Sequence, residues 1–68
     1  MKIEYDPKAD AMYIRMRAGK AVESDEVRPG LVIDFDEEGK VLGIEMLEVS
    51  LRTDNPNELS LSLVSSTQ

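Results

Sequence analysis

Residues 31–47, LVIDFDEEGKVLGIEML, decide the fold because they hold two apolar runs separated by a polar turn. The runs at 31–35 and 41–47 contain the branched and aromatic residues that favour strands. Residues 36–40 (DEEGK) lie between them, and Gly39 can adopt the left-handed conformation of a hairpin loop. The stretch therefore predicts a β-hairpin.

Both predicted hairpin strands carry apolar residues on their two faces. A strand in a half-solvated antiparallel sheet alternates apolar and polar residues instead. We therefore expect the second face to be covered, either by the rest of the chain or by another protomer.

The chain before the hairpin alternates with a period of two, which is typical of strands. Residues 2–5 predict a short strand, and residues 6–10 a turn in which Pro7 fixes φ. In residues 11–17, one expected strand face carries Met12, Ile14 and Met16, and the other carries Tyr13, Arg15 and Arg17.

Residues 18–20 predict a compact reversal into a polar strand at 21–27. The charged side chains of that strand suit the edge of a sheet, where they discourage unwanted pairing. Pro29-Gly30 then predicts a turn before the hairpin.

After the hairpin the pattern is less regular. Residues 47–51 could form one helical turn, and residues 52–57 predict a loop. Residues 58–64 alternate Leu with Ser and could form a final strand, one open to exchange with a partner chain. We expect residues 65–68 to be frayed. Whether residues 52–68 are ordered is left open by the pattern.

Together these patterns predict a mainly β (β-rich α+β) fold in one domain spanning residues 1–64. The expected architecture is an antiparallel meander of four to five short strands, with a second apolar face buried by oligomerisation. A chain of 68 residues without cysteine or histidine lacks disulfides and the usual zinc ligands, so self-association is the expected source of further stability.

The excess of acidic over basic residues limits the kinds of partner that the protein can bind. The net charge of −6 opposes binding to nucleic acid and to anionic membrane surfaces. A basic protein is the charged partner that it favours. Apolar runs are far shorter than the roughly 20 residues of a membrane span, and no secretory segment opens the sequence. We expect a cytoplasmic protein.

A set of carboxylates offers the main candidate for chemistry. Their spacing matches positions one, three, five and twelve of a calcium-binding EF-hand loop, with Gly39 at position six. The flanking runs predict strands, not helices, and strands would draw the ligands apart. We therefore expect no metal site and keep these residues only as weak candidates: Asp34, Asp36, Glu38 and Glu45.

Paired carboxylates can also serve general acid–base chemistry. In a chain with 14 acidic residues, however, such pairs arise by chance, and no histidine or cysteine accompanies them. We expect no enzymatic activity, no catalytic residue and no cofactor.

One basic and aromatic stripe, Tyr13, Arg15 and Arg17, stands on the acidic chain. β-Ribbons can present such stripes to nucleic acid. Pairing of the arginines with Glu23 or Asp25 on a neighbouring strand is the simpler interpretation.

Several segments together resemble a known family. They are residues 5–15 (YDPKADAMYIR), Glu23-Ser24, Pro29-Gly30, residues 33–39 (IDFDEEG) and residues 43–45 (GIE). Over about residues 1–50 the chain resembles domain-of-unknown-function family 2283. The resemblance implies a small prokaryotic, β-rich protein without an established activity, and an antitoxin role for some relatives.

Three functions remain open at this point. The leading expectation is a non-enzymatic, acidic interaction protein that forms a homodimer or higher homo-oligomer. The second is an antitoxin-like partner that neutralises a basic toxin. The third is a weak divalent-cation binder or small hydrolase using the carboxylates in residues 34–45.

Overall fold

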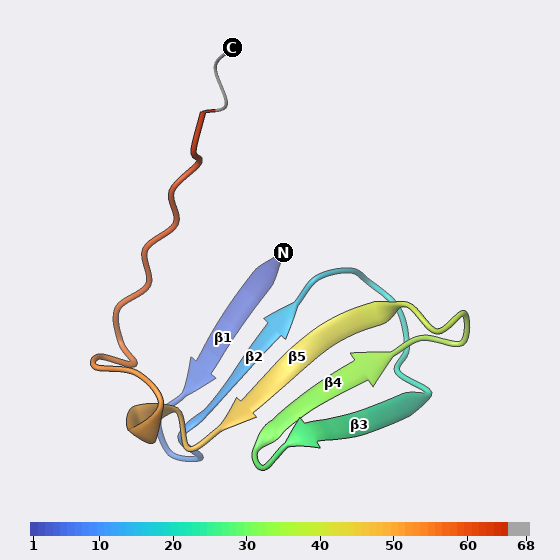
Figure 1. Ribbon diagram of the computed structural model, residues 1–68, viewed down its shortest axis with the longest axis horizontal. Coiled ribbons are helices and arrows are strands. Elements are labelled where there is room, and N and C mark those ends of the chain that lie inside the picture. The colour runs from blue at the N-terminus through green and yellow to red at the C-terminus, as the bar shows by residue number, and fades with distance from the viewer. Residues whose placement is uncertain (66–68) are drawn as a thin grey trace.

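The computed structural model describes residues 1–65 and shows one antiparallel sheet of five strands (Figure 1). The elements are β1 (Lys2–Asp6), β2 (Ala11–Arg15), β3 (Glu23–Arg28), β4 (Leu31–Phe35), β5 (Val41–Leu47) and the 3-10 helix η1 (Val49–Leu51). The predicted mainly β class and the short helical turn near residues 47–51 are confirmed.

The strand order in the sheet is β1-β2-β5-β4-β3, which corrects the expected meander. β5 lies between β2 and β4, so the last four strands form a Greek key. The expected compact reversal at 18–20 is wrong, because residues 16–22 cross the end of the sheet instead. Met16 and Arg17 N–H groups donate to the Leu42 carbonyl (2.8 and 3.3 Å), and the Val22 N–H donates to the Phe35 carbonyl (2.9 Å).

A physical reason for this order lies in the composition of the strands. β3 (ESDEVR) is the most polar strand and its residues are mostly exposed, so it is stable at an edge, as expected. β5 (VLGIEML) is the most apolar and occupies the centre of the sheet. Pairing β2 with β3 would have left the apolar strand at an edge.

The registers give the sheet one apolar and one polar face, so the expected second apolar face of the hairpin is not found: that face carries Asp34 and Glu45 beside Val32. In β2, β5 and β4, Ile14 lies opposite Ile44, which lies opposite Ile33. Alternation along the strands extends these positions into the apolar face: Ile3, Tyr5, Met12, Ile14, Leu31, Ile33, Phe35, Ile44 and Met46. At the β3 edge, Asp25 pairs with Ile33 and Glu23 with Phe35, so two carboxylates border this face. The polar face carries Lys2, Glu4, Tyr13, Arg15, Ser24, Glu26, Val32, Asp34, Gly43 and Glu45.

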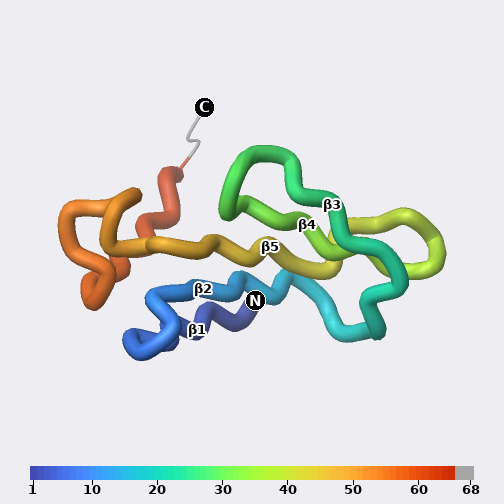
Figure 2. The backbone as a smooth tube through the Cα atoms, turned by 90° about the horizontal axis from the view of Figure 1, so that it is seen from below, coloured from blue at the N-terminus to red at the C-terminus, as the bar shows by residue number. Residues whose placement is uncertain are grey.

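The sheet is twisted, and within residues 1–65 the only helix beside it is η1, whose Val49 lies near Met12 and Met46 at one end of the apolar face. Figure 2 shows β1–β2 and β3–β4 on opposite sides of β5 when the sheet is viewed from below. Among these residues, only Leu42 and Val49 are buried apolar side chains, with 1% and 2% of their surface exposed.

The chain after η1 forms no further strand up to Ser65, so the expected strand at residues 58–64 is absent from this chain. Leu and Ser are mediocre strand formers, and the segment has to find an open sheet edge to pair with. Ser65 is exposed, and the other residues of the predicted frayed tail, 66–68, lie outside the described residues.

Over residues 1–65, no helix has the length and apolar character needed to cross a lipid bilayer.

Candidate functional site

The polar face is organised around Asp34 of β4. Tyr13 of β2 donates its hydroxyl to Asp34 Oδ2 at 3.1 Å, and Ser24 of β3 donates to Asp34 Oδ1 at 2.6 Å. Gly43 of β5 lies between β2 and β4 in this row. The Tyr13–Asp34–Ser24 cluster therefore joins four adjacent strands.

Glycine is required at position 43 because the Tyr13 side chain passes over it. A Cβ on Gly43 would collide with Tyr13 Oη and would lie 2.6 Å from its Cζ and 2.8 Å from the Ile14 carbonyl oxygen. No side chain can occupy that space without displacing Tyr13. The tyrosine ring thus covers the bare backbone of β5 on the polar face.

The electrostatics of this cluster favour a neutral tyrosine. Burial raises the pKa of Tyr13, and the hydrogen bond to the Asp34 carboxylate raises it further. The Arg15 guanidinium lies 5.4 Å from the centre of the Tyr13 ring, a cation–π distance, and opposes this increase in pKa weakly. Each Asp34 oxygen already accepts a hydrogen bond. The Tyr13–Asp34–Ser24 cluster, here also called the clamp, therefore holds β2, β4 and β3 together by side-chain hydrogen bonds.

A second cluster centres on Asp10 in the β1–β2 turn. Asp10 has a positive φ of 53°, which Asp tolerates better than most residues. Its Oδ1 accepts from Tyr5 Oη (2.8 Å) and the Ser50 N–H (3.0 Å), and its Oδ2 accepts from Ser50 Oγ (2.6 Å). Its carbonyl accepts from the Val49 N–H at 3.0 Å. Asp10 therefore attaches η1 to the opposite end of the chain.

These contacts shift the titration of both partners. The hydrogen bonds from Ser50, and then the bond from Tyr5, hold the pKa of Asp10 below its ordinary value. The same Tyr5–Asp10 bond is the main cause that raises the pKa of Tyr5. The attachment is therefore strongest when Asp10 is ionised and Tyr5 is protonated.

Arg52 fixes the chain that follows η1. Its Nε donates to the Leu47 carbonyl at 2.7 Å, and its Nη2 donates to the Pro29 carbonyl at 2.6 Å. Arg52 lies against Gly30, where a Cβ would collide with its guanidinium. Beyond Arg52, the chain and the sheet enclose a hollow. Met12 and Met46 line it from the sheet, and Pro56 and Leu59 line it from the chain after η1.

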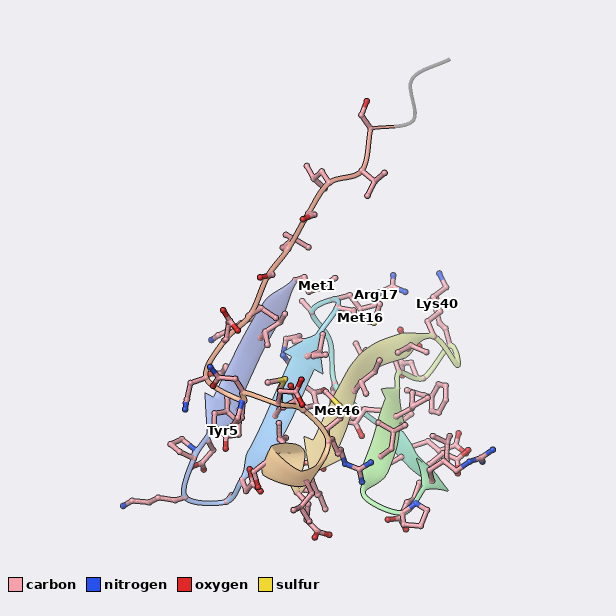
Figure 3. The ribbon with its side chains drawn as sticks, turned by 60° about the vertical axis from the view of Figure 1, so that its left-hand side comes forward. Met1, Tyr5, Met16, Arg17, Lys40 and Met46 are labelled. Atoms are coloured by element: carbon pink, nitrogen blue, oxygen red, sulfur yellow. The ribbon has the colours of Figure 1, made fainter. Side chains whose placement is uncertain are left out.

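The apolar face is only partly covered by the rest of the described chain. Its central side chains, such as Ile14, Ile33 and Ile44, are only half-buried. Exposed apolar side chains continue around it, among them Met1, Met16 and Val22. Figure 3 shows Met1 and Met16 at one end of the sheet and Met46 towards the other.

The structure does not gather the predicted metal candidates. Asp34 lies in the clamp, and Glu45 lies on β5 opposite Tyr13 and Val32. Asp36 accepts hydrogen bonds from the backbone N–H groups of Glu38 and Lys40, both at 2.9 Å, and the Lys40 bond is the main cause that lowers the pKa of Asp36. Among residues 1–65, no three Asp or Glu side chains are close enough together to hold a metal ion.

The predicted pairing of Arg15 and Arg17 with Glu23 or Asp25 is wrong. β2 has β1 and β5 as neighbours, whereas β3 is at the far edge. Arg15 instead stacks on Tyr13. Arg17 is close enough to Asp36 to help lower the pKa of that carboxyl.

Sequence reasoning did not find either cluster. Asp10 and Ser50 are 40 residues apart, and nothing local links them. Gly43 inside an apolar strand was the available signal, since glycine in a strand often marks a place where another group approaches closely.

The protein is thus a single-sheet β protein with one polar and one apolar face. Its residues 2–50 match the family described as protein of unknown function (DUF2283), and the chain belongs to this family. The resemblance in the opening and hairpin segments is thereby confirmed. The match contains all five strands and ends inside η1. No curated protein and no solved structure matches the chain.

Proposed function

We propose that the protein is a non-enzymatic interaction protein that self-associates through its apolar face, most simply as a homodimer. The observation that carries the proposal is the half-buried row Ile14, Ile44 and Ile33 at the centre of a sheet that has no covering layer among the described residues. A sheet with one apolar face is stable when that face packs on another layer.

A second copy is the occupant that the face fits best. Two identical apolar faces are self-complementary about a two-fold axis, as in aligned sheet packing. The charged side chains Glu4, Arg15 and Glu45 lie on the opposite face and stay in solvent in such a dimer. Asp25 pairs with Ile33 and Glu23 with Phe35, so these two exposed carboxylates stand on the apolar face at its β3 edge and would lie at the rim of such a dimer.

Light scattering coupled to size exclusion tests the proposal over a range of micromolar concentrations. We expect a mass of two chains that does not change with salt, since apolar burial is not screened. Ile33→Thr, which keeps a β-branched side chain, should weaken the dimer. Val32→Thr, on the other face of the same strand, is the matched control and should not. A monomeric wild-type chain throughout would contradict the proposal.

An antitoxin-like role is the second candidate, and the net charge of −6 with the exposed acidic residues of β3 supports it. The partner would be a small basic protein. Its binding should weaken as salt is raised, because charge complementarity is screened. A host-cell pulldown that recovers no basic protein at low salt would count against this role.

A further inference from the structure

The segment Leu59–Val64, here called the arm, has the pattern of a strand but pairs with nothing in its own sheet. Leu59, Leu61 and Leu63 alternate with serines and are 65%, 86% and 94% exposed. The arm contains no charged residue, and no backbone hydrogen bond joins it to the sheet. Single exposed leucines are common on protein surfaces, but three in one exposed extended segment are typical of a protein–protein contact surface.

The arm lies beside the start of its own β1 but makes no backbone hydrogen bond to it. Leu59 and Leu61 lie against Met1 and Ile3, at the start of β1. The arm runs in the direction opposite to β1, so its remaining residues extend past the amino terminus of the sheet (Figure 1). Figure 3 shows its side chains continuing beyond Met1 into open space.

β1 is an open edge whose pattern matches the arm. β1 and β3 are the two edges of the sheet. β3 presents acidic side chains and has an irregular register at Glu26/Arg28, both of which hinder the addition of a strand. β1 has a regular register, with Ile3 and Tyr5 on the apolar face and Lys2 and Glu4 on the polar face. An added strand with leucine and serine alternating would continue both faces.

We propose that the arm of one chain adds to β1 of a second copy as a sixth, antiparallel strand, with Leu61 opposite Ile3. In this register Leu59 lies opposite Tyr5 and Leu63 opposite Met1, so all three leucines enlarge the apolar face of the partner. Ser60 and Ser62 then lie on the polar face, opposite Glu4 and Lys2. The proposal rests on the homodimer proposed above and assigns the segment that joins its two chains.

Cysteine cross-linking tests the register, since the chain has no cysteine of its own. Lys2→Cys and Ser62→Cys are made in separate chains and mixed, and oxidation should link the two chains, because directly opposed strand residues lie within disulfide reach. Ser50→Cys replaces Ser62→Cys as the control and should give no link. When both cysteines are in one chain, a linked dimer supports exchange, and a linked monomer contradicts it.

Replacing the leucines separates this inference from the dimer itself. The full-length variant with Leu59, Leu61 and Leu63 changed to Ser should raise the dimer dissociation constant at least about tenfold. The matched control changes Ser60 and Ser62 to Thr and should leave it unchanged. If the leucine variant dimerises as tightly as the wild type, the arm exchange is wrong while the homodimer stands. If the wild type is monomeric, both proposals fail.

Discussion

Tyr13 passes over Gly43 to reach Asp34, so a side chain of β2 bonds to β4 across the backbone of β5. The Tyr13–Asp34 hydrogen bond therefore depends on the lack of a side chain at position 43. The relationship is local in space but joins residues 21 positions apart in the chain.

Gly43→Ala should destabilise the fold. The added methyl group collides with Tyr13 and forces the ring away from Asp34, and overpacking of this kind costs about 1–3 kcal/mol. Urea denaturation followed by circular dichroism measures the change in the free energy of unfolding. In a Tyr13→Ala background the same substitution should cost less. An equal cost in both backgrounds would show that Tyr13 is not the group that requires glycine.

Tyr13→Phe should remove one hydrogen bond and reduce the free energy of unfolding by about 0.5–1.5 kcal/mol near neutral pH. The pKa of Tyr13 is raised in the folded state, so its contribution is complete below the pKa of an unfolded tyrosine. That contribution is lost as the pH rises through the folded value. Denaturation between about pH 8 and 11 should therefore show a shallower alkaline loss for the variant than for the wild type. Parallel curves would contradict the assignment.

Asp10→Asn should lower the melting temperature at neutral pH. Asparagine accepts the positive φ of this position, so the substitution mainly removes the carboxylate that holds Ser50 and Tyr5. The pKa of Asp10 is depressed in the folded state, so its stabilising effect is present above the unfolded pKa and is lost as the pH falls through the folded one.

Melting curves recorded from pH 7 down to about pH 2 should show the difference between wild type and Asp10→Asn closing in acid. Asp6→Asn serves as the control. Asp6 ends β1 and accepts hydrogen bonds from the backbone N–H groups of Lys8 and Ala9, whereas Asp10 accepts them from Tyr5 and Ser50. A difference that persists unchanged at the lowest pH would mean that the charge of Asp10 is not what attaches η1.

The hairpin at residues 31–47 was predictable because its signals are local. Two apolar runs rich in branched residues mark the strands, and Gly39 does adopt the positive φ (81°) that its loop requires. The edge position of β3 followed from its acidic side chains. Each of these features depends on residues that are close together in the sequence.

The order of the strands and the two clusters could not be predicted in the same way. The pairing of β2 with β5 depends on a comparison of all possible partners, and Ala18-Gly19-Lys20 fits a tight reversal as well as a longer connection. The carboxylates at 34–45 matched a ligand spacing, but a hairpin places Asp36 in the turn and Glu45 along a strand. Spacing in sequence becomes a site only when the backbone bends to bring the residues together.

The central position of β5 also constrains how the chain can fold as it is synthesised. β1–β2 and β3–β4 are each antiparallel pairs that can form early, but they do not touch one another in the sheet order. β5 follows β4 after a short turn, but its pairing with β2 closes a loop of more than 25 residues, which costs more chain entropy. A chain that ends before residue 41 lacks the strand that joins the β1–β2 pair to the β3–β4 pair.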